Sequence, residues 1–126
     1  MDANHRNPPA GGISIHAVDI ARGVPAAGLC VRLFRLADGR TEIASGRCSD
    51  GGLLQHPVAE GANVLRGLYE VEFDIAQYYR DAGIDIPDPA FLEVVVYRFG
   101  IDRVGEHFHL PMKFTPWGFS LFRGGA

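Results

Sequence analysis

Short stretches of alternating hydrophobic and polar residues dominate this chain, and clusters of Gly, Pro and Asp separate them. The first stretch, residues 13–18, alternates with the period of two that is typical of a β-strand. It predicts one face made of Ile13, Ile15 and Ala17 and an opposite face made of Ser14, His16 and Val18. An Arg-Gly-Val-Pro sequence at residues 22–25 then interrupts the pattern.

The same alternation predicts several further strands, at residues 29–36, 41–47, 67–73, 91–99, 107–114 and 119–123, with a short segment at 53–58. Turns are expected where Gly, Asp and Pro gather, at residues 37–40, 49–52, 100–105 and 115–118. A change of period predicts one short helix over residues 75–82, with Asp74 as its N-cap and Gly83 as its C-terminal stop. About seven or eight strands and one helix indicate a mainly β fold, an antiparallel β-sandwich.

Length and composition describe a single globular domain. The 126 residues fit one core, and 47% hydrophobic residues with a net charge of -3 are ordinary for such a domain. Lys and Arg number 12 against 15 Asp and Glu, so we expect no nucleic-acid partner. No apolar run is long enough to cross a membrane. The polar residues 1–12 contain no apolar signal segment, so we expect a flexible lead-in before a domain over residues 13–126.

The two cysteines, Cys30 and Cys48, form neither a Cys-x-x-Cys motif nor a disulfide framework. We therefore expect free thiols that pack as small apolar residues, in a cytoplasmic protein. The chain also lacks a Gly-x-Ser-x-Gly nucleophile motif and a Gly-rich phosphate loop. Arg47 and Arg123 are candidates for binding an anion.

Histidines are the main candidates for chemistry. His107 and His109 lie two residues apart, so both project from the same face of their predicted strand. Imidazole titrates near neutral pH, which suits acid–base catalysis. Three interpretations are open for these residues and His16: a structural role only, a three-histidine metal site, or a polar pocket in which histidines from the first and penultimate strands activate water.

Segments at both ends of the predicted domain carry recognisable motifs. They are IHAVD at residues 15–19 with ARGVPA at 21–26, ASGR at 44–47, GLYEVEFD at 67–74 with Tyr78 and Tyr79, HFHLP at 107–111, and TPWGFS at 115–120. Together they resemble the transthyretin-like family, close to its 5-hydroxyisourate hydrolase branch. The resemblance covers nearly all of residues 13–125.

The resemblance implies a transthyretin-like antiparallel β-sandwich with one short helix, assembled as a homotetramer with active sites in grooves between dimers. It also implies an enzyme that opens the lactam ring of 5-hydroxyisourate, a step of urate breakdown, without a metal or cofactor. Hydrolases of this family build their site from two histidines, an arginine and a terminal Tyr-Arg-Gly-Ser, whereas the hormone carriers lack both histidines. The two histidines correspond to His16 and His109, which are therefore the expected catalytic pair.

The remaining positions of the implied site depart from the family pattern. The arginine position falls on Leu53, or on Gly52 if the alignment slips by one residue. The closing tetrapeptide becomes Phe122-Arg123-Gly124-Gly125, which removes the tyrosine and serine hydroxyls. A site that has lost polar groups should favour a ligand with methyl groups in place of N–H groups.

We therefore expect a hydrolase of an N-methylated 5-hydroxyisourate, an oxidised methylxanthine product of methylurate catabolism. His16 and His109 would activate water, and the expected substrate contacts are Leu53, Arg47, Phe122, Arg123 and Gly125. Two alternatives stay open. The first is an ordinary 5-hydroxyisourate hydrolase in which Arg47 or Arg123 replaces the lost arginine. The second is a non-catalytic small-molecule binding protein of the same fold.

Overall fold

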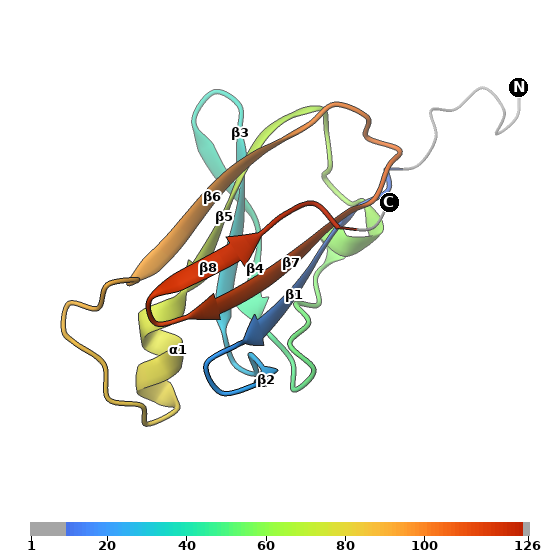
Figure 1. The fold of residues 1–126 in the computed structure, drawn as a ribbon. Coiled ribbons are helices and arrows are strands. Elements are labelled where there is room, and N and C mark those ends of the chain that lie inside the picture. Colours follow the sequence, from blue (N-terminus) through green and yellow to red (C-terminus); the bar gives the residue numbers. More distant parts are fainter. Residues whose placement is uncertain (1–9, 125–126) are drawn as a thin grey trace, which may run out of the picture.

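The computed structural model describes residues 10–124, which form two packed β-sheets (Figure 1). The strand orders are β2-β1-β7-β8 in one sheet and β4-β3-β5-β6 in the other. The elements are β1 (Ile13–Asp19), β2 (Val24–Pro25), β3 (Cys30–Leu36), β4 (Arg40–Arg47), η2 (Pro57–Glu60, a 3-10 helix), β5 (Gly67–Asp74), α1 (Ile75–Asp81), β6 (Val94–Ile101), β7 (Phe108–Thr115) and β8 (Gly118–Leu121). The predicted mainly β sandwich of eight strands and one short helix is confirmed. Residues 1–9 of the predicted lead-in and Gly125 lie outside the described residues.

Neighbouring strands run antiparallel except for β1 and β7, which are parallel. In that pair Ser14 lies opposite His109, and His16 lies opposite Pro111. Hydrophobic alternation says nothing of strand direction, so this pairing was not predicted. It brings the first strand of the chain alongside the histidine-bearing strand near its end.

The predicted faces of the strands are confirmed. Ile13, Ile15 and Ala17 of β1 are buried, while the alternate residues are only half-buried. In β7 the even-numbered residues 108, 110, 112 and 114 fill the core, and the odd-numbered residues face outward. The helix prediction is also confirmed, since Asp74 caps α1 by accepting a hydrogen bond from the Gln77 amide at 3.2 Å.

Three strand predictions need correction. Residues 91–93 lie in a loop because Glu93 binds Arg80 of α1 at 3.0 Å, and β6 continues instead to Ile101. The predicted break at Val24–Pro25 is a short strand that pairs with β1. Residues 53–58 are not a strand, since Leu53 alone pairs with β1 and Pro57, which has no amide hydrogen, begins η2.

A buried carboxylate ties α1 to β1. Asp19 is fully buried and accepts hydrogen bonds from the hydroxyls of Tyr78 at 3.0 Å and Tyr79 at 2.7 Å. Burial, together with the neighbouring Asp19, raises the pKa of Tyr78 to about 12. These contacts fix the end of β1 against the helix.

Cys30 and Cys48 are free thiols, as predicted, and burial raises the pKa of Cys48 to about 12. Within residues 10–124, no helix is long and apolar enough to cross a membrane.

Candidate active site

His16 lies on the outer face of the β2-β1-β7-β8 sheet, where it is half-buried. The turn after β4 docks beside it, because Ala17 donates to the Gly52 carbonyl at 2.8 Å and His16 and Leu53 form an antiparallel bridge. The imidazole Nε2 donates to the Gly51 carbonyl at 3.1 Å. This turn therefore holds the His16 ring in one orientation.

The same turn decides which side chain lies beside His16. Gly52 has a φ of +82°, and a Cβ there would lie 2.3 Å from the Ala17 carbonyl oxygen, so only glycine fits. Leu53 lies directly opposite His16, and opposite residues of an antiparallel pair project to the same face. Its side chain is 45% exposed. Of the two positions where the resemblance expects an arginine, Leu53 is thus the one that presents a side chain to the histidine.

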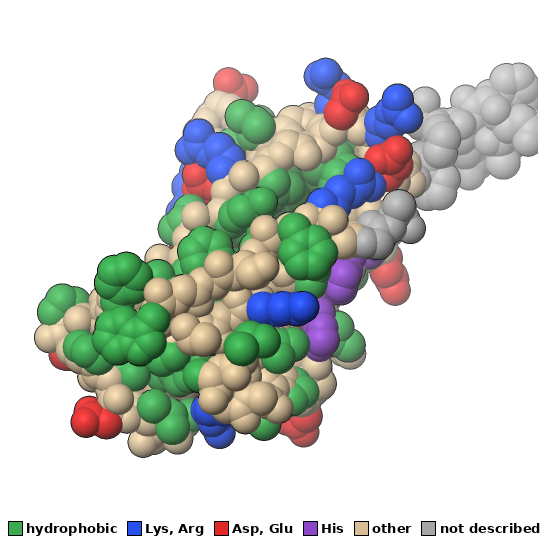
Figure 2. All heavy atoms as spheres, in the orientation of Figure 1, with side chains coloured by type: hydrophobic (Ala, Val, Ile, Leu, Met, Phe, Trp, Pro, Cys, Tyr) green, Lys and Arg blue, Asp and Glu red, His purple; other side chains and the backbone are tan. Residues whose placement is uncertain are grey.

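A second group of side chains converges on Ser14. The Ser14 Oγ lies 2.7 Å from His107 Nε2 and 2.7 Å from His109 Nδ1, and His107 Nδ1 lies 2.5 Å from the Gly11 carbonyl oxygen. Partial burial lowers the pKa of His109, and the neighbouring His16 and His107 lower it further. This shift favours the neutral His109 ring, which can accept a proton. Figure 2 shows histidine side chains together on the surface, beside a basic side chain and hydrophobic ones.

The C-terminal segment borders these histidines. The Gly124 amide donates to the His109 carbonyl at 2.7 Å, and a Cβ at Gly124 would lie 3.3 Å from Pro111 and 3.5 Å from the Phe122 ring. Phe122 is 48% exposed. An apolar ring therefore lies near His109, where the resemblance expects a tyrosine.

Sequence reasoning did not single out Ser14 or Lys113. Lys113 shares the outward face of β7 with His109, four residues away, and lies opposite Ser120 of β8. It is exposed and forms no ion pair with the residues that the structure describes. The period-two rule already places both residues on the histidine face, so that rule was the signal that could have found them.

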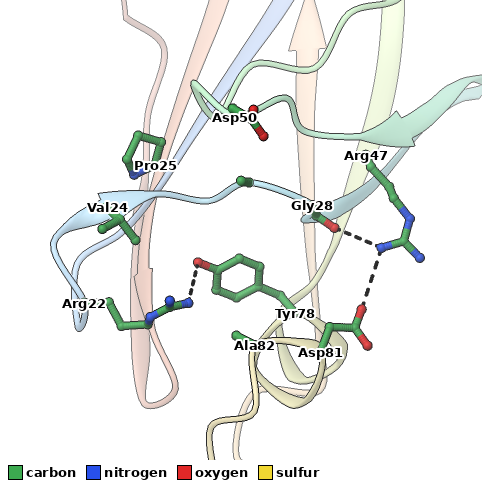
Figure 3. Close-up of a pocket in the computed structure, with 10 residues that line it drawn as sticks. Arg22, Val24, Pro25, Gly28, Arg47, Asp50, Tyr78, Asp81 and Ala82 are labelled. Atoms are coloured by element: carbon green, nitrogen blue, oxygen red, sulfur yellow. Dashed lines mark hydrogen bonds and ion pairs between the residues drawn. The ribbon is translucent and has the colours of Figure 1, made fainter.

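The two arginines that were expected to contact substrate lie elsewhere. Arg47 donates to the Gly28 carbonyl at 3.3 Å and lies 3.7 Å from the Asp81 carboxylate. It lines a pocket of about 510 Å³, shown in Figure 3, together with Tyr78 and Arg22 and without any histidine.

Arg123 stacks over the Phe108 ring at 4.1 Å and donates to the Glu106 carboxylate at 3.1 Å and to the His107 carbonyl at 3.2 Å. Phe108 belongs to the core face of β7, so Arg123 lies away from the outer face that carries His109. Within residues 10–124, neither arginine side chain therefore hydrogen-bonds to His16 or His109.

The structure does not form the three-histidine metal site. Both ring nitrogens of His107 have other partners, Gly11 and Ser14. Among residues 10–124, no group of three or more His, Cys, Asp or Glu side chains is placed to hold a metal ion.

Residues 13–124, nearly all of the described chain, match one protein-family model. The chain belongs to the HIUase/transthyretin family. The two histidines that the resemblance implies, His16 and His109, lie on one sheet face, which agrees with this membership.

Several members of this family are similar over nearly their whole length. The chain is 39% identical to a 5-hydroxyisourate hydrolase of Ralstonia nicotianae, covering 90% of this chain and 98% of that protein. It is 36% identical to the 5-hydroxyisourate hydrolase of Pseudomonas aeruginosa, covering 98% and 99%. The solved structure of the Klebsiella pneumoniae 5-hydroxyisourate hydrolase is 26% identical with a TM-score of 0.76, covering 91% of this chain and 99% of that one.

Two other solved structures share the fold. The structure of (S)-allantoin synthase is 30% identical with a TM-score of 0.85, and the match covers 94% of this chain and 45% of that one. Sea bream transthyretin in complex with thyroxine is 23% identical with a TM-score of 0.80, covering 91% of this chain and 96% of that one. The second likeness concerns the fold alone.

Proposed function

We propose that this protein hydrolyses the six-membered ring of a 5-hydroxyisourate-type compound. The observation that carries the proposal is the placement of His109 and His16 on one outward sheet face, where partial burial and the neighbouring histidines lower the pKa of His109. The family relatives named as 5-hydroxyisourate hydrolases, which match this chain almost from end to end, support the same reaction.

In the proposed reaction, the oxygen of a water molecule attacks the lactam carbonyl carbon and the ring C–N bond breaks. The electron pair of that bond stays on nitrogen, which must gain a proton as it leaves. The pKa of His109 is lowered, so its neutral ring suits accepting the proton from water. His16 lies beside it and would orient that water or protonate the leaving nitrogen.

We further propose that the substrate carries N-methyl groups. Leu53 and Phe122 are exposed apolar residues at positions where the resemblance implies an arginine and a tyrosine. Arg47 and Arg123 are both engaged by carboxylates and backbone carbonyls, and within residues 10–124 neither side chain hydrogen-bonds to the His16 or His109 ring. An added methyl group that fills an apolar site is worth about 1–3 kcal/mol of discrimination.

The assembly we propose is a homotetramer, a dimer of dimers, in the cytoplasm. Edge strands β6 and β8 expose large apolar side chains, including Val94, Val96 and Phe119. Unpaired strand edges are ready templates for pairing with another chain. A second copy of the chain that packs over the face carrying His16 and His109 would close the substrate pocket. Light scattering after gel filtration would measure the mass of the assembly in solution.

The central experiment compares kcat/KM on freshly prepared methylated and unmethylated 5-hydroxyisourate. We expect the methylated compound to be preferred, and His16→Ala or His109→Ala to lower kcat by about 100-fold or more. Ser45→Ala, an exposed change on β4 of the other sheet, is the matched control. Wild-type rates in both histidine variants would refute the mechanism. A preference for the unmethylated ring would support the ordinary hydrolase, and no acceleration of either compound would support a binding protein.

A further inference from the structure

The proposed hydrolysis uses His16 and His109 but leaves Ser14 and His107 without a role. Hydrogen bonds link these two residues to His109 in a series, called here the hydrogen-bonded chain, that begins at His109 and ends at the Gly11 carbonyl. The chain runs from His109 Nδ1 to Ser14 Oγ at 2.7 Å, from Ser14 Oγ to His107 Nε2 at 2.7 Å, and from His107 Nδ1 to the Gly11 carbonyl at 2.5 Å.

The far end of this chain is held firmly. The Gly11 amide donates to the Val104 carbonyl at 2.8 Å, and a Cβ at Gly11 would lie 2.3 Å from the Glu106 carbonyl carbon. Only glycine allows this close approach. The Gly11 carbonyl is therefore a fixed acceptor for the His107 ring.

That acceptor sets the direction of every hydrogen bond in the chain. A carbonyl oxygen carries no proton, so His107 Nδ1 must donate to it, and the Nε2 of a neutral His107 is then an acceptor. Ser14 has one hydroxyl proton, which must go to that Nε2. The Ser14 oxygen can only accept from His109, so His109 carries its single proton on Nδ1.

The consequence concerns the other nitrogen of His109. When the proton is on Nδ1, the Nε2 carries the free lone pair, and within residues 10–124 this atom makes no hydrogen bond. An imidazole alone in water exchanges between two tautomers, and one of them would present an N–H at this position instead of a base.

We propose that Ser14 and His107 are positioning residues that hold His109 in the Nδ1–H tautomer, so that His109 Nε2 accepts the proton from the attacking water. This inference rests on the proposed hydrolase function. It assigns a role to the hydroxyl of the first strand, which the parallel β1–β7 register places opposite His109.

The first test needs no substrate. We expect ¹⁵N NMR of histidine-labelled wild-type protein, at about pH 8 where ordinary imidazoles are neutral, to show a protonated Nδ1 and an unprotonated Nε2 for His109. Ser14→Ala should give a mixture of both tautomers, and Ser14→Thr, which keeps the hydroxyl, should restore the wild-type spectrum. An unprotonated Nδ1 in the wild-type spectrum would overturn the proposal, whatever the variants do.

The second test is kinetic. Ser14→Ala should lower kcat about tenfold with little change in KM, the size of one lost hydrogen bond to the reacting group, and Ser14→Thr should recover most of the rate. Full activity in Ser14→Ala with an unchanged His109 tautomer would refute the positioning role and leave the hydrolase function standing. The expected tautomer in a wild-type protein that opens neither ring would refute the hydrolase function alone.

Discussion

Replacing Leu53 with Arg should weaken the preference of the protein for the methylated substrate. Leu53 lies directly opposite His16, and its side chain is 45% exposed, so a longer side chain can extend over the histidine face without entering the core. A charge-assisted hydrogen bond to a polar substrate atom is worth about 1.5–3 kcal/mol. Losing the apolar contact to a methyl group removes about 1–3 kcal/mol for the methylated substrate.

The guanidinium only donates, and the carbonyl oxygens that can accept from it are present in both substrates, so the ratio changes mainly through the lost contact to the methyl group. Because about 1.4 kcal/mol is a factor of ten, a loss of about 1–3 kcal/mol predicts a change of roughly 5- to 150-fold in the ratio of kcat/KM values. The free energy of unfolding should change by no more than about 0.5 kcal/mol, because the position is partly exposed. The new guanidinium would also lower the pKa of His109 further, which moves the acid limb of the pH–rate profile to lower pH.

The assay follows the loss of each compound's ultraviolet absorbance, with the spontaneous decay subtracted. Leu65→Arg is the matched control, since Leu65 is 56% exposed and precedes β5 in the other sheet. We expect this control to leave the preference unchanged. A Leu53→Arg protein that loses activity equally on both compounds, or whose preference stays within about twofold of wild type, would refute the assignment of Leu53 to the substrate site.

Three further perturbations test other parts of the structure. Asp19→Ala removes the acceptor of two buried tyrosine hydroxyl protons and should destabilise the fold by about 2–5 kcal/mol in urea unfolding, so a loss below about 1 kcal/mol would contradict this role. Burial lowers the pKa of His56 in the folded state, so the unfolded chain binds the proton first as pH falls. The free energy of unfolding should thus decrease as the pH falls below about 6.5, and it should decrease less in His56→Leu than in the wild type. Equal decreases in the two proteins would contradict this role of His56. Lys113→Met should raise KM roughly tenfold if the ammonium group contacts a substrate oxygen, and an unchanged KM would exclude that contact.

Local patterns were sufficient to predict most of the fold. Alternation in residues 13–18 and 107–114 identified the buried and outward faces of β1 and β7 correctly. Asp74 identified the start of the helix, because only a few residue types carry a side-chain oxygen that can accept an amide hydrogen from the first turn. These signals are local, so they do not depend on which strands become neighbours.

Predictions failed where pairing partners decide the structure. Residues 91–93 have strand propensity, but the Glu93 carboxylate binds Arg80 and keeps this segment by the helix. Val24 and Pro25 look like a break, yet the end of β1 offers them a pairing partner. Propensity alone cannot show whether a neighbouring strand is available.

In the candidate site, too, the sequence predicts which residue types are present but not which side chains lie together. The resemblance predicts His16 and His109 as the catalytic pair, and the structure brings both to one sheet face. Arg47 and Arg123, proposed as replacements for the arginine that the resemblance implies, bind other groups in this protomer. Lys113 shares the face of His109, and the alternation along this strand was the signal that could have pointed to it. Side-chain direction therefore decided more than residue type did.

The register of β1 against β7 links the core to the proposed chemistry. Ser14 lies opposite His109, with Ile13 and Ile15 on the other face of the same strand in the core. A slip of one residue would bring an isoleucine to the imidazoles and a serine into the core, because side chains alternate with a period of two. The burial of Ile13 and Ile15 thus holds the Ser14 hydroxyl between His107 and His109. The hydrogen-bonded chain that orients His109 is therefore stabilised by the hydrophobic core beneath it.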